Sequence, residues 1–306
     1  MLRKIIFLVG PTGIGKSAAA VSLARKLKAE IISCDSMQVY RGMNIITSKA
    51  LCAQRRSVKH HLLDVVSPAR EYNVARYRNE ALAICDKLFK KGSLPLFVGG
   101  TGLYYSIIID GLFPAVPEDK KVRAILCKQA KAKGSGWLYK KLARVDSVAA
   151  GRIHPNDTRR IIRALEVFML TGSPISSLQK QRKGLGPEYE VKIFGLNTNR
   201  ELLYKRINAR VERMFTLGLI GEVKRLLKSK LSKTASCAIG IKELKGYFNG
   251  DYPLEEARRL IQQESRRYAK RQLTWFRKDK RIKWINIKDT ETPQLIARRI
   301  YKEYLC

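Results

Sequence analysis

The chain has 306 residues, 45% of them hydrophobic, and is long enough to bury one or two cores. Lysine and arginine number 61 against 26 acidic residues, and the net charge of +35 favours a nucleic-acid partner, although a proteome-wide bias toward basic residues gives the same excess. No apolar run has the length of a membrane span, and the six cysteines form no CxxC pair, so we expect a cytoplasmic protein with reduced thiols and no structural metal.

Apolar runs and helical patterns alternate along the first hundred residues. The runs predict strands at Lys4–Val9, Glu30–Ser33, Leu94–Val98, Val191–Leu196 and Ile282–Ile287. Between the first three of these strands, apolar residues at helical spacing predict helices over Lys16–Lys28 and Ala75–Lys90. Strands that alternate with helices indicate an α/β fold with a parallel sheet and helices on both faces.

The alternation stops after Leu112. A helical stretch rich in lysine and arginine follows, and it ends in the Ser/Gly/Pro-rich passage Ser173–Pro187. We therefore predict a basic helical insertion over 114–186, within a P-loop α/β core made of 1–113 and 187–306. The last third adds a long basic helix, about Glu255–Asp279.

The segment that follows the first predicted strand fits the phosphate-loop pattern G-x-x-x-x-G-K-[ST]. Its residues are Gly10, Pro11, Thr12, Gly13, Ile14, Gly15, Lys16 and Ser17. The glycines let successive backbone N–H groups point at phosphate oxygens, and the following helix adds its positive dipole end. Lys16 supplies a charge to the terminal phosphate and Ser17 a hydroxyl to Mg²⁺.

The acidic residue of this pattern is displaced from its usual place. P-loop hydrolases carry an aspartate at the end of a further strand, but the strand at Leu94–Val98 continues into Gly99-Gly100-Thr101. Asp35 follows the second strand instead, at the sheet edge where α/β proteins bind ligands. The loop is therefore expected to bind a phosphate group without hydrolysing a nucleotide. An ordinary turn or helix cap at Asp35-Ser36 is the alternative interpretation.

A helix is predicted to begin after His154, with Asn156 or Asp157 as its N-cap. Its expected apolar stripe consists of Ile161, Leu165, Phe168 and Met169. Arg159 and Arg163 are four residues apart, so they share a face that suits a phosphate backbone, unless they are simply solvated.

A second basic stretch, Ser265–Lys283, holds nine basic residues against one acid and includes Tyr268, Trp275 and Phe276. Basic residues interleaved with aromatic ones are typical of proteins that bind single-stranded RNA. Aromatic residues at helical spacing more often fill a core, so we expect Trp275 and Phe276 to be buried and the arginines to face the polyanion.

These motifs stand in the order and spacing of the tRNA dimethylallyltransferase family, which the chain resembles from about Val9 to Lys283. The matching blocks are Gly10–Ser17, Asp35–Tyr40, Gly99–Tyr104, Arg159–Glu166 and Lys270–Arg277. The resemblance implies transfer of a dimethylallyl group from dimethylallyl diphosphate to N6 of the adenosine 3′-adjacent to the tRNA anticodon. It also implies Mg²⁺ as cofactor and diphosphate as product.

The resemblance further implies roles for single residues. Lys16 would neutralise the leaving group, Ser17 would lie near Mg²⁺, and Arg210 would clamp the diphosphate. Asp35 would accept the amine proton and Thr101 would contact the target nucleotide, with Arg123 and 159–163 gripping the anticodon stem-loop. The expected tRNA contacts are Asp35, Ser36, Met37, Gln38, Thr101, Arg123, Arg159, Arg160, Ile161, Ile162 and Arg163. We expect a monomer with no membrane partner.

Two residues depart from the family pattern. Ile46 stands where glycine is usual, which would alter the packing of a loop, and Ile241 stands where an aromatic residue is usual, which puts one base-stacking or tRNA contact in doubt. Two other classes fit part of the sequence. A nucleoside-phosphate kinase would use the same loop with the insertion as a lid, and a non-catalytic P-loop protein would only bind RNA.

Overall fold

The computed structural model describes residues 2–113 and 116–305. The chain divides into two compact units: a core unit made of Met1–Ile108 and Pro187–Cys306, and a helical unit made of Ile109–Gly186. The helical unit begins five residues before the predicted insertion, whose first residue, Pro114, lies outside the described residues.

The core unit is built on a six-stranded sheet in which every pairing is parallel. In spatial order the strands are β3 (His60–His61), β2 (Ala29–Cys34), β4 (Leu94–Gly99), β1 (Arg3–Val9), β5 (Tyr189–Asn197) and β6 (Lys283–Asn286). The predicted α/β class and the five predicted strands are confirmed to within two residues at each end. The short edge strand β3 was not anticipated, because two histidines carry no apolar pattern.

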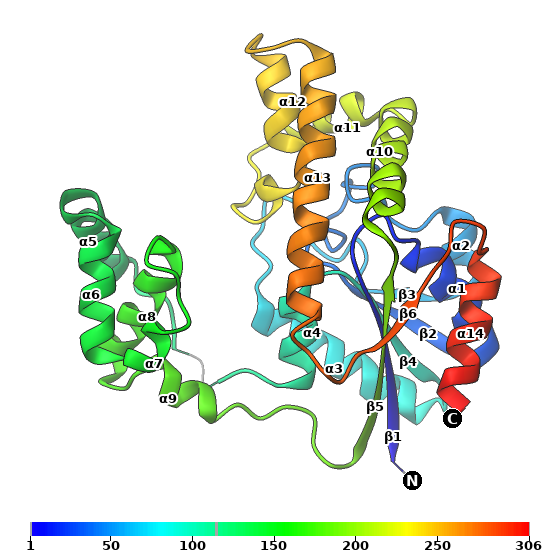
Figure 1. Ribbon diagram of the computed structural model, residues 1–306, viewed down its shortest axis with the longest axis horizontal. Coiled ribbons are helices and arrows are strands. Elements are labelled where there is room, and N and C mark those ends of the chain that lie inside the picture. Colours follow the sequence, from blue (N-terminus) through cyan, green and yellow to red (C-terminus); the bar gives the residue numbers. More distant parts are fainter. Residues whose placement is uncertain (1, 114–115, 306) are drawn as a thin grey trace. The chain divides into compact units, whose positions relative to one another are not determined.

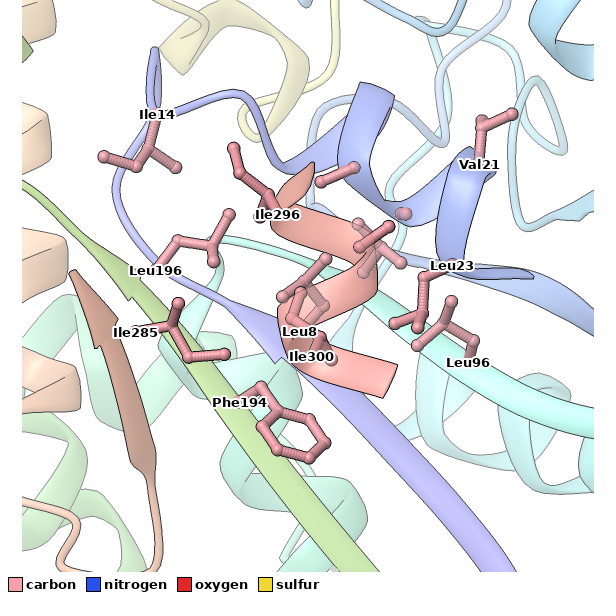
Figure 2. Close-up of a cluster of buried hydrophobic side chains, with 14 of the residues drawn as sticks. Leu8, Ile14, Val21, Leu23, Leu96, Phe194, Leu196, Ile285, Ile296 and Ile300 are labelled. Carbon is pink, nitrogen blue, oxygen red and sulfur yellow. The ribbon is translucent and has the colours of Figure 1, made fainter. Parts of the chain in front are cut away.

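One face of the sheet is covered by α1 (Lys16–Leu27) and α14 (Pro293–Leu305), which pack against each other and against aliphatic strand residues (Figure 1). Figure 2 shows Ile296 and Ile300 of α14 among Leu8, Phe194 and Leu196 of the strands. The N-terminal and C-terminal segments of the chain therefore share one buried cluster.

The opposite face is lined by aromatic rings. Phe7 stacks on Phe97 with ring centroids 4.6 Å apart, and the ring of Tyr105 meets Phe7 edge-on. Tyr105 also contacts Phe276. These rings connect β1 and β4 to α4 (Gly102–Ile109) and α13 (Leu254–Phe276), beside α3 (Val74–Lys90).

The rest of the core unit is helical. It contains α2 (Cys52–Ser57), α10 (Arg200–Thr216), α11 (Leu219–Leu226), the 3₁₀ turn η1 (Ala235–Cys237) and α12 (Ile241–Phe248). Helix α13 contacts both α10 and α12, and α10 contacts α11 (Figure 1). This group of helices brings the last third of the chain to the carboxyl end of the sheet.

The helical unit has a core of its own. Its helices are α5 (Lys120–Lys133), α6 (Ser135–Val145), α7 (Ser147–Ala150), α8 (Thr158–Thr171) and α9 (Ile175–Lys180). Asp157 caps α8 by accepting a hydrogen bond from the N–H of Arg160, as predicted. Of the predicted apolar stripe, Ile161 and Leu165 are buried, but Met169 is 47% exposed, so the stripe is shorter than the periodicity indicates.

The prediction that Trp275 is buried needs correction. Phe276 is buried as expected, but Trp275 is 40% exposed: one part of its ring packs against Gly102, where a Cβ would approach it to 2.4 Å, and the rest stays accessible. Cys34 and Cys85 are buried free thiols, whereas Cys52, Cys127 and Cys237 are free and exposed; Cys306 lies outside the described residues. Within the described ranges, each helix is too short or too polar to cross a membrane.

Candidate active site

The segment Gly10–Ser17, called the glycine loop below, connects the carboxyl end of β1 to the start of α1. Gly10 has a φ of 142°, and a Cβ on it would lie 2.7 Å from the carbonyl O of Leu196, so only glycine fits there. Gly15 is the N-cap of α1 with a φ of 97°. The loop thus places the first N–H groups of α1 at the sheet edge, an arrangement that suits an anion.

Lys16 lies within this loop. Its Nζ donates hydrogen bonds to the carbonyl oxygens of Gly10, at 2.9 Å, and Pro11, at 2.7 Å. Burial lowers the pKa of Lys16 to about 7; the charge of Asp35 opposes this shift and that of Arg210 adds to it. Its pKa makes Lys16 sensitive to any charge that enters the site.

Arg210 of α10 reaches the glycine loop from a position 198 residues along the chain. Its Nη1 donates to the hydroxyl of Thr12 and its Nε donates to the hydroxyl of Ser48, at 2.9 Å. Burial lowers the pKa of the guanidinium, and the charge of Asp35 opposes that effect. The structure therefore brings Arg210 to the place where a diphosphate clamp was predicted.

Asp35 follows β2, and its side chain stabilises a turn, as in the alternative interpretation of Asp35-Ser36 as an ordinary turn. Its Oδ1 accepts hydrogen bonds from the N–H groups of Met37, at 2.9 Å, and Gln38, at 3.4 Å. The same carboxylate influences the pKa of both Lys16 and Arg210. Asp35 thus stabilises a turn and also supplies a carboxylate near the two cations Lys16 and Arg210.

Thr101 lies just after β4, the strand that pairs with β2. Its N–H donates to the carbonyl O of Cys34, at 3.2 Å, and its hydroxyl accepts from the N–H of Ser36, at 3.1 Å. Burial raises the pKa of Tyr268 on α13 to about 12; the charge of Asp35 adds to this shift, and the side chains of Thr101 and Gln272 oppose it. The polar residues after β2 and β4 therefore form one connected group with α13.

Gln272 is a site residue that no sequence motif indicated. Its Oε1 accepts a hydrogen bond from the N–H of Thr12, at 2.7 Å, and its Nε2 donates to the carbonyl O of Gly100, at 2.9 Å. The side chain is buried on α13, on the same face as Ala269 and Phe276. An uncharged polar residue on the apolar face of an amphipathic helix is the signal that could have revealed it, because buried polar groups require partners.

These groups surround a cavity of about 910 Å³. Its polar wall includes Thr12, Lys16, Ser17, Asp35, Ser36, Gln38, Arg210 and Tyr268. Its apolar wall includes Ile31, Met37, Ile45, Ile46, Met214, Leu217, Ile239 and Ile261. The cavity can therefore hold a ligand with an anionic end and an apolar end.

The two departures from the family pattern lie near this cavity. Ile46 lines it and is buried against Gly240, whose Cβ would lie 3.3 Å from the Cδ1 atom of Ile46. Ile241 is buried at the start of α12 and presents little surface to a ligand. Ile46 thus shapes the cavity wall, and Ile241 is a core residue.

The predicted tRNA residues of the helical unit fall into three groups. Ile161 and Ile162 are buried in its core, so a contact of these two residues with RNA would be made through their backbone. Arg123 and Arg163 are partly buried and paired with the fully buried carboxylate of Glu166, at 2.9 and 2.7 Å.

The third group, Arg159 and Arg160, is exposed at the start of α8. Arg160 lies 3.4 Å from the carboxylate of Asp157. Burial would raise the pKa of the Glu166 carboxyl, but the hydrogen bonds from Arg163 and Arg123 hold that pKa below its ordinary value. The helical unit therefore contains one arginine pair fixed by a carboxylate and one at its surface.

Fold and site together define an α/β protein in which a glycine loop whose N–H groups suit an anion faces a partly apolar cavity. Residues 38–279 match the IPP transferase family, and residues 3–67 match the family described as isopentenyl transferase. The chain belongs to the tRNA dimethylallyltransferase, or isopentenyltransferase, family.

Individual relatives agree over nearly the whole length. The chain is 46% identical to the tRNA dimethylallyltransferase of Carboxydothermus hydrogenoformans, covering 99% of this chain and 98% of that protein. It is 44% identical to the tRNA dimethylallyltransferase of Pelotomaculum thermopropionicum, covering 97% and 95%.

Solved structures give the same result. The tRNA isopentenylpyrophosphate transferase of Bacillus halodurans is similar with a TM-score of 0.73 at 39% identity, covering 99% of this chain and 96% of that one. A eukaryotic dimethylallyltransferase acting on tRNA is similar with a TM-score of 0.82 at 27% identity, covering 99% and 79%.

Proposed function

We propose that this protein is a tRNA dimethylallyltransferase. It transfers the dimethylallyl group of dimethylallyl diphosphate to N6 of the adenosine 3′-adjacent to the anticodon, and it releases diphosphate. The observation that carries the proposal is the cavity beside the glycine loop, in a chain whose relatives of similar length have this activity. The cavity offers cations for a diphosphate and an apolar wall for a five-carbon chain.

The chemistry follows from the placement of the charged groups. Lys16 and Arg210 neutralise the negative charge that develops on diphosphate as its bond to the allylic carbon breaks. The lone pair of N6 forms the new bond to that carbon, and Asp35 accepts the proton that N6 loses. The apolar wall that includes Met37 and Ile46 excludes water, which would otherwise capture the allylic cation.

Mg²⁺ is part of this proposal. The hydroxyl of Ser17 lies exposed at the start of α1, next to Lys16. Over residues 2–113 and 116–305, the structure contains no group of three or more His, Cys, Asp or Glu side chains that could hold a metal. A single hydroxyl fits a cation that the diphosphate oxygens largely coordinate, as is usual for Mg²⁺. Bound there, Mg²⁺ would add positive charge beside the leaving group.

The partners follow from the same proposal. The target adenosine must leave its stack to reach the cavity, and Thr101, Ser36 and Gln38 line or adjoin the place where it would arrive. Arg159 and Arg160 would contact the anticodon stem-loop through its phosphates. The proposed enzyme is cytoplasmic and monomeric; a tRNA substrate and the net charge of +35 support this proposal.

The test uses radiolabelled dimethylallyl diphosphate, Mg²⁺ and bulk tRNA. We expect label to enter tRNA and, after digestion to nucleosides, to migrate as a prenylated adenosine. A tRNA transcript with another base at the target position is the matched control and should remain unlabelled. Turnover of ATP without RNA would favour the kinase alternative, and RNA binding without transfer would favour the non-catalytic one.

A further inference from the structure

We propose that Glu222 is a positioning residue for the diphosphate site. It orders the loop Asn44–Ser48, called the anchored loop below, so that Ser48 fixes the orientation of Arg210. This inference rests on the proposed function, because it assumes that Arg210 binds the diphosphate of the donor. Glu222 itself does not contact the ligand.

Glu222 accepts three hydrogen bonds from the backbone of the anchored loop. Its Oε2 accepts from the N–H groups of Asn44, at 3.0 Å, and Ile45, at 2.9 Å, and its Oε1 accepts from the N–H of Ile46, at 2.9 Å. Glu222 is only 3% exposed. Three successive N–H groups thus converge on one buried carboxylate, which holds the backbone more firmly than neutral acceptors would.

Ser48, at the end of the anchored loop, has an unusual backbone conformation. Its φ of 47° lies in the left-handed region, which is unfavourable for a residue with a side chain. The turn that imposes it is held by the hydrogen bond from the N–H of Ser48 to the carbonyl O of Ile45, at 2.9 Å. Such a conformation persists only where the surroundings impose it, and it occurs often at functional sites.

The side chain of Ser48 contacts Arg210. In its left-handed conformation, Ser48 presents its hydroxyl to the Nε of Arg210 at 2.9 Å, while the Nη1 of Arg210 donates to Thr12. Two fixed points determine the plane of a guanidinium, which carries five donors in total. The remaining N–H donors of Arg210 can therefore point at a diphosphate held by the glycine loop.

Two further hydrogen bonds support the anchored loop. The amide of Gln38 donates to the carbonyl O of Thr47, at 3.2 Å, and the Nζ of Lys49 donates to the side chain of Asn44, at 3.2 Å. These contacts keep the loop near the cavity, but neither fixes Ser48 or Arg210. The carboxylate of Glu222 is the group that binds the loop backbone at three successive residues.

The test measures binding of inorganic diphosphate by isothermal titration calorimetry, with Mg²⁺, to the full chain. In Glu222→Gln, a side-chain amide replaces one carboxylate oxygen with a donor that cannot accept the N–H bonds. We expect diphosphate affinity to fall about tenfold, the effect of losing one well-placed hydrogen bond, with tRNA affinity within twofold of the original. Ser48→Ala should produce a similar loss, and the double variant should lose little more than either alone.

The matched control is Glu212→Gln. Glu212 lies on α10 near Arg210 in sequence, but its side chain is 46% exposed and pairs with Arg258 away from the cavity lining. The Glu212→Gln variant should bind diphosphate with the affinity of the original protein. Unchanged affinity in Glu222→Gln would overturn the positioning role, as would unchanged affinity in Ser48→Ala or fully additive losses in the double variant.

The outcomes separate this inference from the proposed function. If the original protein binds diphosphate and transfers the dimethylallyl group, but Glu222→Gln binds equally well, only the positioning role fails. If diphosphate binding depends on Glu222 but no transfer to tRNA occurs, the proposed function fails and the positioning role stands. If the original protein does not bind diphosphate, both are overturned.

Discussion

The ammonium of Lys16 lies 2.7 Å from the carbonyl O of Pro11, within the same loop. Together with its hydrogen bond to Gly10, this contact directs the charge of the lysine onto the loop backbone in the ligand-free protein. A diphosphate must therefore draw the ammonium away from two carbonyl groups. It gains in exchange a full ionic contact, which is stronger than a hydrogen bond to a neutral acceptor.

The first prediction concerns this exchange. Lys16→Ala should weaken diphosphate binding and slow single-turnover transfer, while tRNA affinity measured by filter binding stays within about twofold. The reason is that Lys16 lies in the glycine loop, and the arginines expected to bind RNA lie elsewhere in the chain. Comparable losses of both affinities would show that the loop holds RNA or serves only the fold.

The second prediction concerns the dependence of stability on pH. The pKa of Lys16 in the folded protein is about 7, below the 10.5 of a free lysine, so the unfolded chain binds more protons at this residue between these values. The contribution of Lys16 to the free energy of unfolding should therefore rise with pH from about 7 to 10.5, and its destabilising effect should be largest below pH 7.

Replacing the lysine with an uncharged chain of similar length tests that sign. Lys16→Met should raise the thermal midpoint of the ligand-free protein more at pH 6.5 than at pH 9.5. Lys26→Met on the exposed side of α1 is the control, and it should shift the midpoint equally at both pH values. A larger gain at the higher pH would contradict the assignment of the low pKa to Lys16.

The third prediction separates the two roles of Asp35. Asp35→Asn keeps an Oδ1 acceptor for the N–H groups of Met37 and Gln38 but removes the proton acceptor. Single-turnover transfer should fall by about 10²–10⁴, with both substrate affinities and thermal stability little changed. Asp35→Ala should in addition cost about 1 kcal/mol of stability, because the turn loses its acceptor. A fully active Asp35→Asn enzyme would show that Asp35 stabilises the turn and is not the proton acceptor.

The fourth prediction concerns Gln272, which links the N–H of Thr12 to the carbonyl O of Gly100. Gln272→Ala leaves both buried groups without that partner, so unfolding should become easier by about 1–3 kcal/mol. The KM for dimethylallyl diphosphate should rise more than the KM for tRNA. Gln262→Ala, on the same helix but paired with Glu212, is the control for general damage to α13.

The fifth prediction distinguishes the arginines of α8. Arg159 is exposed, so Arg159→Ala should reduce the slope of log affinity for tRNA against log salt by about 0.7 to 0.9 and leave stability unchanged. Arg163→Ala removes one partner of the buried carboxylate of Glu166 and should lower the thermal midpoint of unfolding as well. Equal effects of the two changes on stability would contradict this distinction.

Local patterns were sufficient for the five longer strands, the glycine loop and the cap of α8. These features depend on residues that are neighbours in sequence, and a run such as Lys4–Val9 followed by Gly10–Ser17 specifies its own geometry. The patterns could not indicate how wide a buried face would be. Met169 and Trp275 fit the helical period but lie at the margin of their helices' buried faces, and the period alone does not locate that margin.

The contacts that complete the site could not be predicted, because they join residues far apart in sequence. Gln272 meets Thr12 across 260 residues, and Glu222 meets Ile46 across 176. Arg210 was placed at the loop by resemblance, since its own surroundings in α10 give no reason for it to approach Thr12. The pairing of Arg123 with Glu166 likewise depends on how α5 packs against α8.

The position of β1 in the sheet has a consequence for synthesis on the ribosome. Its register with β4 joins Ile6 to Leu96, but its other edge pairs with β5, where Arg3 meets Tyr189. A nascent chain can therefore complete only one side of β1 until the whole helical unit has been translated. At roughly 5–20 residues per second, one edge of the first strand stays open for several seconds, during which a passing strand of another chain could pair with it.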